Sequence, residues 1–168
     1  MSIQMIVAST IDGVIGSNNA LPWKLRADMQ NFRKVTTGSV VIMGRATFES
    51  MGSKPLPNRE NIVVTSKAYL PKGFYVANSI PEALSLSRDK FPDKDIFVIG
   101  GASIYSQMVD LVDTLHITTI YSDIDGDTYL EPIKCQDWDV ISRHLVCVDD
   151  VNSHPHIIEV RERLRHAQ

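Results

Sequence analysis

The chain has 168 residues, 43% of them hydrophobic and 22% charged, which is typical of a single soluble globular domain. A net charge of −3 at pH 7 argues against nucleic acids and anionic membranes as partners, but leaves room for a local basic pocket that binds a small anion. Cys135 and Cys147 match no disulfide or metal-binding spacing, so we expect two half-buried thiols. We expect a cytoplasmic protein, because the chain shows no signal-peptide pattern and no apolar run of about 18 residues.

The first apolar run, residues 3–9, is short enough to predict a buried β-strand. Turn-forming aspartate, glycine and asparagine residues follow, so residues 10–24 are predicted to be one long loop and not a hairpin. A loop of this length in a compact domain is often a lid or a binding loop. Trp23, near its end, suits either a core position or the wall of a pocket.

A helix is predicted after Pro22, because apolar residues recur with helical spacing at Leu25, Met29 and Phe32. Asp28 falls beside this apolar stripe in the first part of the helix. One interpretation is an acid favoured by the helix dipole. The other is a desolvated carboxylate with a raised pKa that binds a cationic or amidine-like group. The helical pattern alone leaves both open.

Two strands run directly into glycine and then into a helix. Residues 40–43 lead into Gly44, and residues 95–99 lead into Gly100-Gly101. Free N–H groups at a helix start favour anions, although glycine also serves simply to let a strand and a helix pack closely. The spacing is not G-x-G-x-x-G, so the usual dinucleotide fingerprint is absent. Two such junctions in one chain nevertheless suit a dinucleotide with an extra phosphate.

Two arginines are candidates for binding anionic groups. Arg45 follows Gly44, and its planar charge suits a phosphate. Arg59 lies between a proline-stiffened turn and a strand, where a fixed guanidinium suits a carboxylate. Solvent-exposed arginines without a ligand are the alternative for both.

The remaining elements complete the predicted fold. Strands are predicted at 61–66, 74–77 and 114–121, a helix begins after Ser79, and an antiparallel hairpin joins 139–148 to 156–160. His154 and His156 are expected to be surface groups. Strands alternate with helices up to about residue 110 and dominate afterwards, which predicts an α/β fold with a mainly parallel sheet that ends in an antiparallel strand.

Five segments together resemble the dihydrofolate reductase family, in the family's order and at nearly its spacing. They are Ala20-Leu21-Pro22-Trp23 followed by Asp28 and Phe32, then residues 41–52, 56–61, 98–102 and 126–128. The resemblance favours the desolvated carboxylate at Asp28. It implies a central, mostly parallel eight-stranded sheet with an antiparallel C-terminal strand, flanked by about four helices. It also implies a single domain over 1–168, with an adenosine-binding subdomain at about 39–92 and a loop subdomain in the remainder.

The activity implied by the resemblance is NADPH-dependent reduction of 7,8-dihydrofolate to tetrahydrofolate, which supplies one-carbon metabolism and thymidylate synthesis. Asp28 would bind the 2-amino group and N3 of the pterin, and a water would protonate N5 while C6 receives the hydride. Antifolate inhibitors would bind the same site, and the protein would be a monomer. The loop around Asp127 resembles one that latches a lid near Gly16.

The resemblance also assigns the site residues, with no metal ligand among them. The catalytic group is Asp28, Trp23 and Leu21. The substrate group is Ile6, Val7, Asp28, Met29, Phe32, Met51, Leu56, Arg59 and Thr118. The cofactor group is Ala8, Ile15, Asn19, Ala20, Gly44, Arg45, Ala46, Thr47, Val64, Thr65, Ser66, Lys67, Ile99, Gly100, Gly101, Ala102, Ser103, Ile104 and Tyr105. Ala46 and Ser103 depart from the commonest bacterial pattern in the cofactor group.

Two alternative functions stay open. A pyrimidine reductase of the riboflavin pathway shares the implied fold and NADPH, although Asp28 and the Trp23 loop favour the folate substrate. A nucleotide-binding domain without catalysis is the second alternative. Turnover of dihydrofolate, or cofactor binding without any turnover, distinguishes these possibilities.

Overall fold

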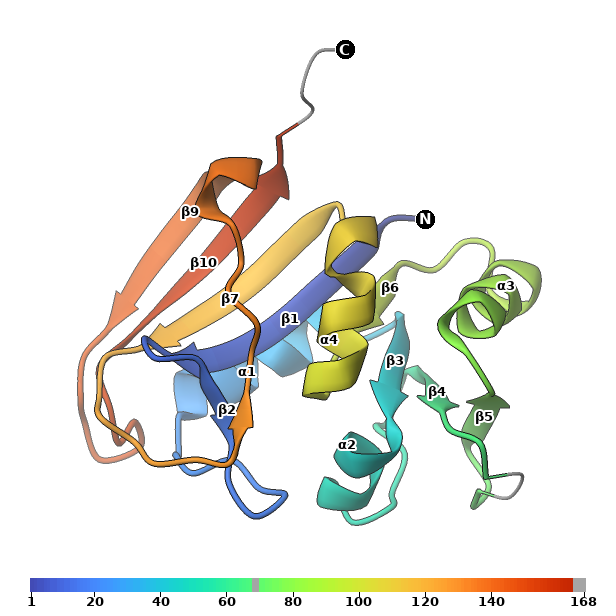
Figure 1. The fold of residues 1–168 in the computed structure, drawn as a ribbon, viewed down its shortest axis with the longest axis horizontal. Helices are drawn as coiled ribbons and strands as arrows, with labels where there is room; N and C mark the ends of the chain where they lie inside the picture. Colours follow the sequence, from blue (N-terminus) through green and yellow to red (C-terminus); the bar gives the residue numbers. More distant parts are fainter. Residues whose placement is uncertain (68–69, 165–168) are drawn as a thin grey trace.

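The computed structural model describes residues 1–67 and 70–164 as an α/β fold built on an eight-stranded sheet (Figure 1). The strand order is β5-β4-β3-β6-β1-β7-β10-β9. All neighbours from β5 to β7 pair in parallel, and β10 is antiparallel to both of its neighbours, as predicted. The strands are β1 (Ile3–Thr10), β3 (Val40–Gly44), β4 (Glu60–Val64), β5 (Phe74–Ala77), β6 (Ile96–Val98), β7 (Thr114–Ile120), β9 (Trp138–Val146) and β10 (His156–Arg163).

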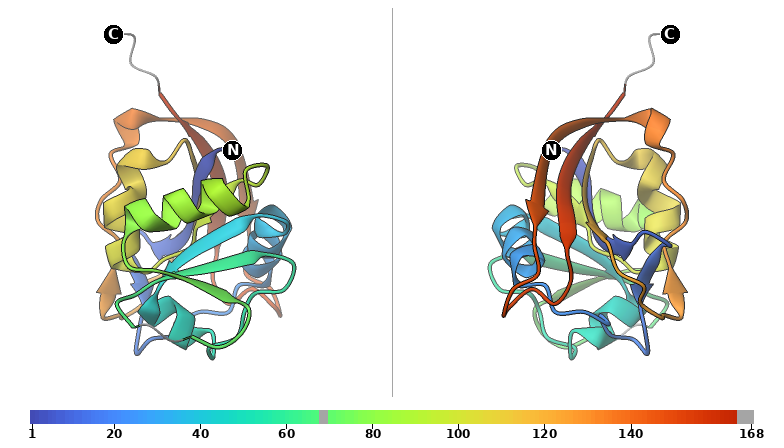
Figure 2. Two further views of the ribbon diagram at one scale, coloured as in Figure 1. Left: turned by 90° about the vertical axis from the view of Figure 1, so that its right-hand side faces the viewer. Right: turned by 90° about the vertical axis from the view of Figure 1, so that its left-hand side faces the viewer.

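The sheet separates two apolar layers, because successive side chains of a strand point to opposite faces. Met5 and Ile42 pack in one buried cluster with α4, whereas Ile6 and Val41 pack in another against Phe32 of α1. Figure 2 shows α1 and α4 on opposite sides of the sheet. The helices are α1 (Arg26–Thr36), α2 (Arg45–Ser50), α3 (Ile80–Lys90) and α4 (Ala102–Met108), with short 3-10 turns η1 (Val109–Leu111) and η2 (Cys135–Asp137). None of the described helices is long and apolar enough to cross a membrane.

The prediction of one uninterrupted loop over residues 10–24 was wrong in part. Strand β2 (Val14–Gly16) forms within it and pairs antiparallel with β8 (Thr128–Tyr129). Gly126 allows this close approach: a Cβ added there would lie 2.6 Å from the carbonyl oxygen of Gly16. The pairing joins segments more than 100 residues apart, so local turn residues do not reveal it.

The first turn of α1 is capped by a residue from the far end of the chain. Leu25 occupies the N-cap position and provides no side-chain hydrogen bond. Instead, the backbone N–H of Ala27 donates to Asn152 Oδ1 at 3.0 Å, and Asn152 Nδ2 donates to both carboxylate oxygens of Asp149 at 3.0 Å each. The backbone N–H of Ser153 also donates to the carbonyl of Lys24 at 2.9 Å. The position of α1, which carries Asp28, therefore depends on residues 149–153.

Asn152→Ala should lower the free energy of unfolding by about 1 kcal/mol, the usual effect of losing an N-cap side chain. It also leaves Asp149 without the amide that it binds. Urea unfolding at pH 7 measures the change, with the exposed neighbour Asp150→Ala as the matched control, which should stay within roughly 0.5 kcal/mol of the wild type. Equal effects of the two substitutions would contradict this account of the cap.

Two expectations about burial were wrong. His156 was expected at the surface but is fully buried, because β10 lies between β7 and β9 and not at the edge of the sheet. Cys135 and Cys147 were expected to be half-buried, but both are exposed. Cys135 lies in η2 and Cys147 follows the edge strand β9, and neither position is covered by another layer.

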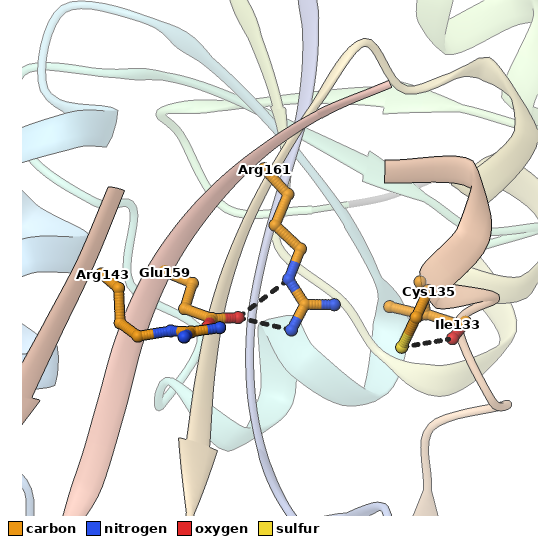
Figure 3. A network of polar contacts seen from close by, with 5 residues as sticks. All are labelled: Ile133, Cys135, Arg143, Glu159 and Arg161. Atoms are coloured by element: carbon orange, nitrogen blue, oxygen red, sulfur yellow. Dashed lines mark hydrogen bonds and ion pairs between the residues drawn. The ribbon is translucent and has the colours of Figure 1, made fainter. Parts of the chain in front are cut away.

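An ion-pair group centred on the buried Glu159 links the outer strands of the sheet (Figure 3). Glu159 of β10 is 4% exposed and accepts hydrogen bonds from Arg143 Nε at 2.5 Å and from Arg161 Nε at 2.8 Å. Burial by itself raises the pKa of Glu159, but the hydrogen bonds and charges of the two arginines together hold it below its usual value. The carboxylate therefore stays ionised inside the sheet and joins β9 to β10.

Candidate active site

Asp28 lies in the first turn of α1, with its side chain turned into the protein and 8% exposed. Thr118 Oγ1, on β7, donates a hydrogen bond of 2.6 Å to Asp28 Oδ1. Burial raises the pKa of the Asp28 carboxyl, while the Thr118 hydrogen bond and a smaller electrostatic contribution from His156 oppose this increase. The arrangement matches the desolvated carboxylate interpretation, in which a charged acceptor is held for a ligand with paired N–H donors.

Asp28 opens onto a cavity of about 370 Å³. Trp23 forms part of its wall, and its ring also packs in a core cluster with Leu25 and Ile120, so both interpretations of Trp23 hold at once. Trp23 Nε1 is buried and has no hydrogen-bond partner within the described part of the chain. Leu21 and Met29 also line the cavity and are each 51% exposed, which leaves apolar surface at its entrance.

The predicted apolar wall comes together on the α1 side of the sheet. Phe32, Met51 and Leu56 pack against the buried cluster that contains Ile6. Val7 is different, because its side chain packs in the cluster on the opposite face of β1. The side chain of Val7 therefore lies on the other face of the sheet from this wall.

Arg59 is held in a fixed plane beside this wall. Its Nη1 donates to Thr36 Oγ1 at 2.9 Å, its Nε donates to the Pro57 carbonyl at 3.0 Å, and its guanidinium lies 5.8 Å from the centroid of the Phe32 ring. Burial, followed by repulsion from Arg33, lowers the pKa of Arg59. A planar cation prepared in this way suits a carboxylate ligand.

The two glycine junctions meet at neighbouring strand ends. The backbone N–H of Gly44 donates to the carbonyl of Gly100 at 2.7 Å, and Gly44 and Gly101 are the N-cap residues of α2 and α4. Gly100 has a φ of +113°, and an added Cβ would lie 3.1 Å from the Tyr105 hydroxyl. An added Cβ on Gly101 would lie 3.4 Å from Thr47 Oγ1. The surface here consists of backbone that a diphosphate can approach closely.

A basic group lies beside the first junction. Arg45 Nε pairs with Glu49 Oε1 at 2.6 Å, and Arg45 Nη1 is buried without a partner among the described residues. The hydrogen bond from Arg45 lowers the pKa of Glu49, and the charge of Lys67 acts in the same direction, so the two cations lie near one acid. Thr65 is buried, whereas Ser66 is exposed at the end of β4. This group suits a further phosphate.

The other predicted cofactor residues lie on several elements of the fold. Tyr105 is buried and its hydroxyl donates to the Ile6 carbonyl at 2.8 Å; burial, with a smaller contribution from the Asp28 charge, raises its pKa. Asn19 and Ala20 lie on an exposed turn. The remaining positions are Ala8 on β1, Ile15 on β2, Val64 on β4, Ile99 after β6, Ala46 on α2, and Ala102, Ser103 and Ile104 on α4.

The sequence pattern missed three residues that support the site. Thr36 orients Arg59, Asn152 caps the helix that carries Asp28, and His156 acts on the charge of Asp28. Helical spacing could have identified Thr36, because it lies four residues after Phe32 on the same face of α1. The other two lie more than 120 residues from Asp28, and no local signal identifies them.

Comparisons with known proteins agree with this geometry. The family model described as dihydrofolate reductase matches residues 2–163. The chain is 38% identical over 157 residues to a dihydrofolate reductase of Staphylococcus aureus (strain Mu50), covering 93% of this chain and 94% of that relative. It is 39% identical over 140 residues to one from Haemophilus influenzae, covering 83% and 85%.

A solved structure extends the agreement to the whole fold. Dihydrofolate reductase from Enterococcus faecalis, complexed with NADP(H) and RAB-propyl, is similar with a TM-score of 0.89 and 34% identity, covering 96% of both chains. The matches in sequence and in structure thus extend over both the acid-bearing helix and the two glycine junctions. The chain belongs to the dihydrofolate reductase family.

Proposed function

We propose that this protein reduces 7,8-dihydrofolate to 5,6,7,8-tetrahydrofolate with NADPH, and that Asp28 holds the pterin during the reaction. The observation that carries the proposal is a buried carboxylate, bonded to Thr118 and raised in pKa, at the wall of a cavity. The family of the chain supports the same activity.

The residues present fit NADPH, which when bound supplies the hydride for C6 of the substrate. Gly100 and Gly101 are the positions expected to contact the diphosphate, and the φ of +113° at Gly100 is one that favours glycine. The buried Nη1 of Arg45, which has no partner among the described residues, suits the phosphate on the adenosine ribose, together with Thr65, Ser66 and Lys67. That extra cation surface favours NADPH over NADH.

Asp28 performs a binding and electrostatic role on the substrate. Its carboxylate has two oxygens that match the 2-amino group and N3 of the pterin, which are adjacent donors. Thr118 occupies one lone pair of Oδ1 and fixes the rotamer. The negative charge makes N5 more basic, and a water delivers the proton to N5. Ile6, Phe32, Met51 and Leu56 exclude solvent along the ring, and Arg59 binds the α-carboxylate of the glutamate tail.

The test is NADPH oxidation followed by absorbance, with dihydrofolate as substrate, in the presence and absence of methotrexate. We expect turnover that methotrexate stops. Turnover of the ribosylamino-pyrimidine in place of dihydrofolate would move the function to the pyrimidine reductase. Binding of NADPH without oxidation of either substrate pair would indicate a nucleotide-binding domain without catalysis.

The contact between residues 16–18 and Asp127 predicts control of the loop that ends in Trp23. The backbone N–H of Asn18 donates to Asp127 Oδ2 at 2.8 Å, and that of Asp127 donates to the Gly16 carbonyl at 3.1 Å. Asp127→Ala should lower kcat more than it raises KM, because it loosens the loop without removing a substrate contact. Steady-state kinetics checks this, with the exposed Asp125→Ala as control. Equal losses in kcat and in substrate affinity would argue against loop gating.

Three further expectations accompany the proposed activity. We expect a monomer that works in the cytoplasm, with an adenosine-binding subdomain at about 39–92 and a loop subdomain in the remainder. Size-exclusion chromatography with light scattering measures the mass in solution. A dimer would contradict the first expectation without affecting the proposed reaction.

A further inference from the structure

Asn61 is a buried polar side chain that the proposed reaction does not use. It is the second residue of β4 and is 1% exposed. β4 pairs with β3 on one side and with β5 on the other, so the backbone of Asn61 is fixed within the sheet. Its partners in the register, Val41 and Phe74, pack in the apolar cluster on the α1 side. Asn61 therefore lies on the face of the sheet where the substrate residues gather, and an amide buried there is costly unless it is hydrogen-bonded.

The hydrogen bonds of the Asn61 side chain go to the two ends of one short segment, residues 56–59. Asn61 Oδ1 accepts from the backbone N–H of Leu56 at 2.9 Å, and Nδ2 donates to the Leu56 carbonyl at 3.0 Å. Nδ2 also donates to the Arg59 carbonyl at 3.0 Å. Both ends of the segment carry a residue that we expect to contact the substrate. One amide group thus sets the backbone of Leu56 and of Arg59 at the same time.

The orientation of the Arg59 guanidinium depends on where this segment lies. Its Nε donates to the carbonyl of Pro57, which belongs to the same segment, and its Nη1 donates to Thr36 Oγ1 on α1. Thr36 is 0% exposed, and its own hydroxyl donates to the Phe32 carbonyl at 2.7 Å, so the Thr36 oxygen is oriented as an acceptor. The plane of the guanidinium is thus defined by one acceptor on the segment and one on the helix. Both bonds form only while the segment keeps its position relative to α1.

The other contacts of the segment do not replace those of Asn61. The backbone N–H of Gly38 donates to the Asn58 carbonyl at 2.8 Å, which joins the segment to the end of α1 but involves neither Leu56 nor the Arg59 carbonyl. Asn58 has a φ of +59°, a left-handed conformation that the chain adopts less readily than helix or strand. Leu56 is also held by its packing in the apolar cluster on the α1 side. Loss of the Asn61 amide should therefore affect Arg59 more than Leu56.

We propose that Asn61 is a positioning residue for Arg59: its amide orders residues 56–59 in the ligand-free protein and so sets the affinity of the site for the carboxylate of the glutamate tail. A cation that is already held in its binding geometry loses little conformational entropy when the carboxylate binds. Without Asn61 the segment has to become ordered during binding, which weakens the complex. The effect on substrate affinity rests on the proposed function, whereas the effect on Arg59 does not.

The first experiment follows the Nε–H group of Arg59 by ¹H–¹⁵N NMR in the ligand-free protein, with the signal assigned from its loss in Arg59→Leu. In Asn61→Ala this proton should exchange with water about tenfold faster, because its bond to the Pro57 carbonyl opens more often. The matched control is Asn152→Ala, which removes another buried asparagine that bonds a backbone N–H, but at the opposite end of α1. Exchange at Arg59 should stay as in the wild type there.

Steady-state kinetics gives a second readout that a general loss of stability does not produce. In Asn61→Ala, KM for dihydrofolate should rise about five- to tenfold with little change in kcat, and KM for a substrate without the glutamate tail should not change. In an Arg59→Leu background the same substitution should have no further effect on KM, because Asn61 then has no cation to position.

Two results would overturn the proposal: unchanged exchange at Arg59 in a folded variant, or effects of Asn61→Ala and Arg59→Leu on KM that simply multiply in the double variant. Asn61→Ser, whose short side chain cannot bond both ends of the segment, should show the same faster exchange and serves if Asn61→Ala fails to fold, as judged by circular dichroism. Faster exchange in a protein that does not reduce dihydrofolate would support the role of Asn61 while rejecting the proposed function.

Discussion

Asp28→Asn should lower kcat/KM for dihydrofolate at pH 7 by about 100-fold, because losing one partner of a buried, charged hydrogen-bonded pair costs roughly 2–5 kcal/mol. The amide keeps the size of the side chain and a contact with Thr118, which donates to Asp28 Oδ1 in the wild type. Activity should recover in acid, where the substrate arrives already protonated. Stopped-flow measurement of NADPH oxidation across pH checks both parts.

Asp28→Glu is the matched control, because it keeps the charge and changes only the reach of the carboxylate. It should retain far more activity than Asp28→Asn at neutral pH and should show no recovery in acid. If Asp28→Asn instead lost the same factor at every pH, the carboxylate would be acting only as a scaffold, and its electrostatic role would be wrong.

Asp28→Asn should lower activity but raise the stability of the folded protein. Burial raises the pKa of Asp28 in the folded state, so the folded protein is destabilised by the ionised carboxylate at pH values above that raised pKa. Asp28→Asn should therefore increase the free energy of unfolding at neutral pH, and the difference should shrink as pH falls through the raised pKa toward the ordinary value. Urea unfolding over a pH series measures it.

Asp127 should show the opposite dependence of stability on pH in the same urea-unfolding series. Hydrogen bonds from the Asn18 N–H, and then from Thr128, lower the pKa of Asp127, so its contribution to stability is present at neutral pH and lost in acid. Asp127→Asn should thus destabilise the protein at neutral pH and approach the wild type as the pH falls. The two variants should therefore change the free energy of unfolding with opposite signs at neutral pH. Such a result would show that the Asp28 carboxylate destabilises the fold, whereas the hydrogen-bonded Asp127 carboxylate stabilises it.

Arg59→Leu should raise KM for dihydrofolate by about 100-fold and change kcat much less, because a bidentate, charge-assisted pair contributes roughly 3 kcal/mol and lies away from the reacting atoms. Thr36 and Pro57 already hold the guanidinium in place, so little entropy is lost when the tail carboxylate binds. Steady-state kinetics with dihydrofolate measures the effect.

A truncated substrate without the glutamate tail tests the contact between Arg59 and the tail carboxylate by itself. It should show nearly the same KM with the wild type and with Arg59→Leu. The control variant is Arg33→Leu, which removes a neighbouring exposed cation that lowers the pKa of Arg59 but is not expected to contact the substrate. A large loss with the truncated substrate would show that Arg59 supports the pocket itself rather than the tail.

Local patterns in the sequence predicted the parts of the fold and site that depend on local chemistry. The strand–glycine–helix junctions at Gly44 and Gly100 follow from apolar runs and from backbone freedom, and the structure has both. The helix that begins after Leu25 follows from its apolar spacing. For Asp28, this spacing left two interpretations open; the family resemblance favoured the desolvated carboxylate, and the structure shows that the side chain is buried.

Local sequence patterns did not predict the features that depend on pairing between distant segments. The β2–β8 pair requires contact between residues 14–16 and 128–129. The burial of His156 requires that β10 insert beside β7, whereas a hairpin pattern fixes only its partner β9. The same placement brings Asn152 to the start of α1. A polar residue in a loop carries no information about which helix end it will reach, so these assignments need the tertiary structure.

The insertion of β10 between β7 and β9 also has a consequence for protein synthesis. Translation releases the chain from its N-terminus, and a nascent chain that ends before residue 150 contains the strands of the nucleotide half but lacks the cap of α1 and the strand that covers β7. The start of the acid-bearing helix therefore stays without its cap until the last segment of the chain leaves the ribosome.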